Sequence, residues 1–258
     1  MRRPELRNRN IGTASSGFKH RNIMAIPESV LDRLGKDSRY YERVKLDHVH
    51  HFEIGTNELT VLYENLRPGY SYGCTPADVA HLISLLPEED VAGIDLISFR
   101  QPTRKQVQQS PVWGRFIYYA TIGSYEGRCV NLEAFDVSKT IEWPRKLSVE
   151  SQAELERLKK DGHLHEETRR SHRLTVTETS LRNHILYRTL LHEIGHWVDY
   201  DSKINRPNDR LDEDWDRAFD LYFSRPSAER EAFAHRYAVE QSAKLRLDKK
   251  IPFDRISD

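Results

Sequence analysis

The sequence contains few cysteines and no long apolar run. Only Cys74 and Cys129 occur among its 258 residues, without the spacing of a cysteine metal site, so we expect two reduced thiols and leave a single disulfide as the alternative. No segment approaches the roughly eighteen apolar residues of a membrane span, and the N-terminus lacks the apolar core of a signal peptide. These absences predict a cytoplasmic protein with no membrane partner.

An excess of charge of one sign is also missing. The chain has 40 basic and 40 acidic residues and a formal net charge of zero, which argues against a protein built mainly to bind nucleic acid. Basic residues nevertheless gather near the N-terminus together with Asn, Ser and Gly. We therefore expect residues 1–40 to form a flexible basic arm, through which a nucleic-acid contact stays possible, and residues 41–258 to form one domain.

The apolar pattern after the arm predicts an α+β fold with a mixed β-sheet. A helix is expected over 77–86, because Thr75 can cap it and Pro76 suits its first turn. A charged insertion at about 137–172 should contain a surface helix from Val149 to Lys160 that ends at Gly162, and this helix could shield the cleft. Alternation of apolar and polar residues predicts the strands, at 59–63, 94–99, 115–121, 129–135 and 173–178.

The most informative stretch is His192-Glu193-Ile194-Gly195-His196. Residues four apart on a helix lie one turn above each other, so both imidazoles can take adjacent corners of one zinc tetrahedron. Glu193 follows the first histidine, where a carboxylate can take a proton from a zinc-activated water. The lead-in lacks Pro and Gly, so we expect a helix over 181–200 with Thr179 or Ser180 as its N-cap.

A hydrolytic zinc site needs a third protein ligand, and the next donors lie in a helix-forming run at 227–238. Glu231 shares its helix face with small residues and His235, which would allow close approach to the first helix. Glu229 shares its face with bulkier and charged residues. We therefore expect Glu231 to bind the metal, with Glu229 as the alternative, and His235 to orient a ligand.

These motifs resemble the gluzincin-type zinc metallopeptidases, most closely the anthrax lethal factor-like and MtfA-like branches. The resemblance covers roughly residues 173–240 and rests on the stretch from His192 to Asp199 and on Glu231-Ala232-Phe233-Ala234. It implies a zincin-like α+β core in which one helix carries the two histidines and a following helix carries the glutamate. It also implies that segment 173–178 is an edge strand that binds an extended peptide beside the cleft.

The relatives commonly carry a tyrosine about seven residues before the glutamate ligand. Tyr222 lies seven residues before Glu229 but nine before Glu231, so it is the candidate oxyanion donor and also a reason to question the ligand assignment. The resemblance implies a zinc metallopeptidase acting on a protein or peptide, with Glu193 as general base. A regulatory or binding protein that keeps the metal fold and a zinc hydrolase of a non-peptide amide are the alternatives.

Two further histidine groups are candidates for a second metal. His48, His50 and His51 occupy one short segment, and His163 and His165 occupy another. Neither group has a convincing further ligand in the sequence, so we expect surface or partly packed histidines.

Overall fold

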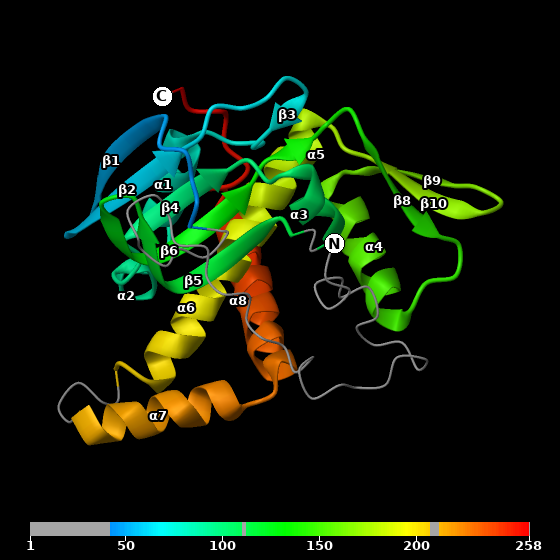
Figure 1. The fold of residues 1–258 in the computed structure, drawn as a ribbon. Helices are drawn as coiled ribbons and strands as arrows, with labels where there is room; N and C mark the ends of the chain where they lie inside the picture. The colour runs from blue at the N-terminus through cyan, green and yellow to red at the C-terminus, as the bar shows by residue number, and fades with distance from the viewer. Residues whose placement is uncertain (1–41, 110–111, 207–211, 258) are drawn as a thin grey trace, which may run out of the picture. The chain divides into compact units, whose positions relative to one another are not determined.

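The computed structural model describes residues 42–109, 112–206 and 212–257 (Figure 1). The basic arm expected over 1–40 lies outside these residues. Residues 44–258 form one compact unit, and only this unit is described below. Among the described residues, no helix is long and apolar enough to cross a bilayer.

A mixed five-stranded sheet carries the main core, as the sequence predicts. The spatial order of its strands is β1-β2-β4-β6-β5, in which β2, β4 and β6 run parallel and the two outer pairs are antiparallel. The central strand β4 is buried along its whole length, as expected where helices or loops cover both faces of a parallel region. The strands are β1 (His48–Ile54), β2 (Asn57–Tyr63), β4 (Leu96–Arg100), β5 (Gly114–Ile122) and β6 (Tyr125–Glu133).

Short elements connect the strands of this sheet. The helix expected after Thr75 is present, and Thr75 and Asp78 form a reciprocal capping box with Pro76 in the first turn. Both cysteines are buried and no disulfide joins them, as expected for reduced thiols. The connecting elements are α1 (Pro76–Ser84), α2 (Glu88–Val91), α3 (Arg104–Gln109) and a two-stranded ladder of β3 (Tyr70–Ser71) with β7 (Phe135–Asp136).

The insertion at 137–172 is more ordered than the sequence predicts. Its helix α4 (Val149–Asp161) starts at the Ser148 cap and ends at a left-handed Gly162, as expected. Two strands were missed, β8 (Thr140–Pro144) and β9 (Leu164–Glu167), and both pair with β10 (Ser171–Thr175).

This pairing corrects the prediction for segment 173–178. Strand β10 is the middle strand of the sheet β8-β10-β9, so its main-chain groups are used on both sides and it is not an edge strand. The predicted alternation holds, because Leu174 is buried between exposed Arg173 and Thr175. Alternation reports one buried face of a strand but does not reveal how many neighbours the strand has.

The helix expected over 181–200 is a longer helical run with a change of winding inside it. It comprises α5 (Glu178–His184), a π-helical segment η3 (Ile185–Leu190) and α6 (Leu191–Lys203). The cap is Thr177 rather than Thr179 or Ser180, and Ser180 completes a capping box with it. The wider π turn was not predicted, and such turns frequently occur near functional sites.

Two helices follow, α7 (Asp212–Ser224) and α8 (Ser227–Leu247), and α8 lies along α6 (Figure 1). The small-residue face predicted for α8 makes this contact, because Ala234 and Ala238 are buried. Gly195 of α6 faces the backbone of Ala234, and a methyl group at Gly195 would lie 2.9 Å from the Ala234 Cα atom. The hydroxyl of Tyr237 on α8 also donates to Asp90 of α2 at 3.0 Å.

The contact at Gly195 leads to a stability prediction. Glycine to alanine inside a helix normally gains up to about 1 kcal/mol, but overpacking a close contact costs about 1–3 kcal/mol. We expect Gly195→Ala to lower the free energy of unfolding of the metal-free protein in a urea titration, because the new methyl group must push α8 away from α6. A variant as stable as the parent or more stable would contradict the close packing.

Candidate functional site

Three donor groups meet where α8 crosses α6. The Nε2 atom of His192 lies 3.3 Å from Oε2 of Glu231, and the Nε2 atom of His196 lies 3.6 Å from Oε1 of the same carboxylate. The two imidazole rings are 4.8 Å apart and nearly perpendicular. The structure therefore brings together the two histidines and the glutamate that the sequence singled out as metal donors.

Glu229 is turned away from this cluster. Its carboxylate accepts a hydrogen bond from Nε of Arg225 at 3.1 Å. Glu229 and Glu231 lie on the same helix and their side chains are equally exposed, at 54%. Position around the helix, rather than burial, separates the two glutamates.

The separations and charge states of the donors fit a metal ion. Two donors that each lie about 2.1 Å from a tetrahedral zinc are separated by about 3.4 Å, close to the distances of His192 and His196 from the two oxygens of Glu231. The group whose donor atoms all lie within 4.8 Å of one another is His192, Glu231 and His235. Burial lowers the pKa of His196 to about 4, so its ring is neutral, as a ligand must be. The hydrogen bond from His192 lowers the pKa of Glu231 below its usual range, so this carboxylate is charged.

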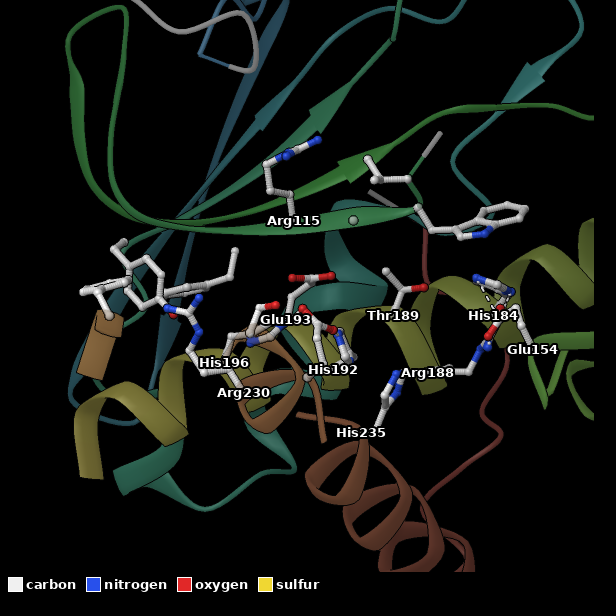
Figure 2. Close-up of a pocket in the computed structure, with 18 residues that line it drawn as sticks. Arg115, Glu154, His184, Arg188, Thr189, His192, Glu193, His196, Arg230 and His235 are labelled. Atoms are coloured by element: carbon white, nitrogen blue, oxygen red, sulfur yellow. Dashed lines mark hydrogen bonds and ion pairs between the residues drawn. The ribbon is translucent and has the colours of Figure 1, made fainter. Parts of the chain in front are cut away.

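Glu193 points from α6 towards strand β5, between the two histidines (Figure 2). The side chain is buried, and burial raises its pKa to about 7, while a backbone hydrogen bond from Phe116 of β5 favours the ionised form. A carboxyl group with a pKa near neutrality can accept a proton and release it again at physiological pH.

Strand β5 forms the roof of a cavity of about 590 Å³ that contains the donor cluster. It is the last strand of its sheet, so β5 rather than β10 is the edge strand beside the candidate site. The strand passes closely over the helix below, since a methyl group at Gly114 would lie 2.6 Å from Cγ2 of Thr189. Gly114, Arg115, Phe116 and Tyr118 line the cavity from this strand.

Tyr222, the expected oxyanion donor, does not line the cavity. Its hydroxyl donates to Oδ2 of Asp199 at 3.0 Å and lies 3.4 Å from the hydroxyl of Tyr118. Asp199 is fully buried and also forms ion pairs with Lys203 and Arg225. It therefore joins α6 to the end of α7 and to the short link before α8. This geometry gives Tyr222 a bracing contact and gives no support to its predicted catalytic role.

The other end of the cavity is built by residues that sequence reasoning missed (Figure 2). Arg188 donates to Glu154 at 2.9 Å and forms an ion pair with Asp161 at 2.8 Å, so helix α4 of the insertion forms a fixed wall rather than a separate surface element. The His184 ring lies 4.1 Å from the ring of Trp113.

One sequence signal could have found this end of the cavity. His184, Arg188, His192 and His196 recur every four residues. In a regular α-helix such a series drifts by about 40° at each step, which would spread it around the axis. The wider turn of η3 counteracts the drift.

A second group of possible donors lies beside this wall. Asp161, His163 and His184 each offer one atom within 4.8 Å of the others, and His163 belongs to one of the histidine pairs noted in the sequence. Arg188 already forms an ion pair with Asp161 and lies 2.7 Å from Nδ1 of His184, so the Arg188 guanidinium supplies positive charge to this group. We interpret the group as a structural ion-pair network.

The remaining predicted histidines have ordinary partners. His48 bonds to Asn65 and His51 to Thr60, both through ring nitrogens on strand β1. His235 contacts the candidate site, with its ring 4.4 Å from that of His192. His192, Glu231 and His235 also offer atoms within 4.8 Å of one another, which makes His235 a possible additional donor.

The matched glutamates of α8 give a direct test of the donor set. Glu231→Ala should weaken zinc binding by at least roughly 100-fold, because loss of an outer-shell partner alone costs about 10–100-fold. Glu229→Ala should keep the affinity of the parent, because this side chain faces Arg225. Competition titration with a chelating dye measures both values. The reverse pattern would assign the site to Glu229.

Removal of the Tyr222 hydroxyl tests whether this group stabilises the fold or takes part in catalysis. Tyr222→Phe takes one hydrogen bond from buried, charged Asp199, which should lower the free energy of unfolding by about 1–3 kcal/mol and leave the zinc content unchanged. Any hydrolytic rate should fall less than tenfold, whereas loss of an oxyanion donor costs about 100- to 1000-fold. A loss of that larger size without a change in stability would restore the catalytic role of Tyr222.

Comparisons of the chain with protein-family models, with curated proteins and with solved structures find no match. The site is therefore interpreted from its own geometry, which consists of two imidazoles and one carboxylate at the crossing of two helices with a second, buried carboxyl group beneath an edge strand.

Proposed function

We propose that this protein is a zinc-dependent metallopeptidase with a zincin-like core. The observation that carries the proposal is the convergence of His192, His196 and Glu231, with Glu193 beside them in a cavity that is open enough to admit a ligand. A structural zinc site would not need an acid or base next to the donors. The two buried cysteines form no disulfide, which is typical of proteins in the cytoplasm, and the cytoplasm is the compartment that we propose.

In this proposal each residue of the site has one task. A bound zinc ion supplies Lewis acidity, which activates water and polarises a peptide carbonyl. His192, His196 and Glu231 would hold the ion. Glu193 takes the proton from the attacking water and passes it to the leaving nitrogen, while the N–H group of Phe116 keeps its carboxylate oriented.

The edge strand suggests how a peptide would lie. Within the described residues β5 pairs only with β6, so an extended segment could add to its other side by main-chain hydrogen bonds. The register shift between Ile117 and Ala120 limits this regular pairing to the part of β5 nearest the cavity. A peptide held there would pass over Glu193 and the donor cluster.

Two other functions use the same geometry. A regulatory or binding protein would need the metal but not Glu193, and the burial of this carboxyl group next to the donors argues against it. A zinc hydrolase of a non-peptide amide would need the whole set. The free edge of β5 beside the cavity favours a peptide, because a small amide has no use for main-chain pairing.

The general base can be tested with a nearly isosteric change. Glu193→Gln should retain zinc and lose about 100- to 10,000-fold in hydrolytic rate, because an amide cannot accept the proton. The substrate would first be found by incubating zinc-loaded protein with a diverse peptide library and identifying cleavage sites by mass spectrometry, with a chelator as the control.

Three results would count against the proposal. These are wild-type protein that binds no zinc, cleavage that persists in the chelator, and a Glu193→Gln variant that cleaves at the parental rate. Stoichiometric zinc with no cleavage of any library peptide would favour the regulatory alternative.

A further inference from the structure

Arg230 occupies the end of the cavity that lies opposite Arg188 (Figure 2). It comes from the first turns of α8, immediately before Glu231, and lies at the His196 side of the donor cluster. It lines the cavity together with His196 of α6 and Tyr118 of β5. A ligand lying between these two elements would therefore meet this guanidinium.

The two arginines differ in how their charge is balanced. Arg188 is paired with Glu154 and Asp161, so its charge is neutralised within the protein. For Arg230 the described part of the chain shows no ion pair, and the nearest carboxylate on its helix, Glu231, is engaged by His192 and His196. A cationic group without an internal counter-ion is left to attract an anion from solution.

Aromatic rings hold Arg230 in place. Its guanidinium lies 5.3 Å from the ring centroid of Phe223 and 5.7 Å from that of Tyr222, and Phe223 lines the cavity. Stacking on rings fixes the plane of a guanidinium without using its N–H donors, which stay available for a ligand. Partial burial further strengthens a charge-assisted hydrogen bond relative to one in open water.

We infer that Arg230 is a carboxylate-binding residue of the cleft, which makes peptides that carry a carboxylate next to the scissile bond the preferred substrate class. This inference rests on the proposed function for its substrate, a peptide. A planar guanidinium matches a carboxylate with two parallel hydrogen bonds. Glu193 and Glu231 lie in the same cavity, and their negative charge disfavours a more highly charged anion such as phosphate.

The carboxylate can come from an acidic side chain or from the C-terminus of the peptide. The test therefore uses two pairs of acetylated hexapeptides. In the first pair the C-terminus is an amide, and a glutamate is compared with glutamine at each position in turn. In the second pair no acidic side chain is present, and a free C-terminal carboxylate is compared with the amide. Binding is measured by isothermal titration with full-length, zinc-loaded Glu193→Gln protein, so that no cleavage is needed.

We expect one acidic member to bind about tenfold or more tightly than its neutral counterpart, since a charge-assisted pair is worth that much. Adding Arg230→Gln should abolish the preference without changing the affinity for the neutral peptides. Arg230→Lys should retain part of it, because the charge remains and the bidentate geometry is lost. The matched control is Arg236→Gln, which removes an exposed arginine of the same helix outside the cavity and should keep the full preference.

The inference is overturned if acidic and neutral peptides bind equally, if no peptide binds, or if the preference survives Arg230→Gln in protein with parental zinc content. Its failure can be told from failure of the proposed function. Cleavage by the wild type with no acidic preference would refute only the role of Arg230. Binding of acidic peptides that depends on Arg230, without cleavage by the wild type, would refute only the hydrolysis.

Discussion

The close approach of α6 and α8 is the constraint on which the candidate site depends. Gly195 stands between the two histidines of α6 and presents no side chain to Ala234, so the helix backbones nearly touch. Glu231 lies one turn before Ala234 on α8, and the same contact that buries the alanine carries the carboxylate to the imidazoles. A larger residue at either contact position would separate the donors as well as the helices.

Hydrogen bonds at both ends of the helix pair preserve this approach. Asp199 of α6 accepts hydrogen bonds from Tyr222 and Lys203 and forms an ion pair with Arg225, which secures the chain just before α8 begins. Further along, Tyr237 of α8 donates to Asp90 of α2, which itself packs on α6. Buried charges of this kind are costly unless they are satisfied, so these contacts define one relative position of the helices rather than a range of positions.

Burial also sets the chemistry of the site. Burial raises the pKa of Glu193 to about 7 and lowers that of His196 to about 4. For a histidine the neutral form is the one that binds a metal. For Glu193 the raised pKa gives a carboxyl group that can exchange a proton near neutral pH, as its proposed role requires.

The sequence predicted the parts of the structure that local patterns encode. The spacing of His192 and His196 and the small residues on the face of Glu231 predicted that these three side chains lie together, and the Thr75 and Ser148 caps placed two helices. It did not predict that β10 is flanked by two strands, because the alternation of apolar and polar residues is the same in an edge strand and in a central strand. It also assigned Tyr222 by analogy in spacing, whereas its hydroxyl partner, Asp199, lies on another helix.

Arg188 and Arg230 were missed for different reasons. Arg188 belongs to a four-residue series with His184, His192 and His196, which falls on one face only because the turn of η3 is wider than that of a regular helix. Arg230 is an isolated arginine in a helical segment and carries no sequence signal that separates a solvated side chain from one that lines a cavity. Their different roles become visible only when Glu154 and Asp161 are found beside one arginine and two aromatic rings beside the other.

X-ray absorption spectroscopy at the zinc edge tests the central claim most directly. The account predicts one zinc per chain with two imidazole nitrogens at about 2.0–2.1 Å, a carboxylate oxygen at about 2.0–2.2 Å and one further light ligand from water. The spectrum should lose one imidazole in His192→Ala and in His196→Ala, and none in His235→Ala. A spectrum with three imidazoles, reduced to two by His235→Ala, would show that His235 closes the position the mechanism needs, and the account of a catalytic site would be wrong.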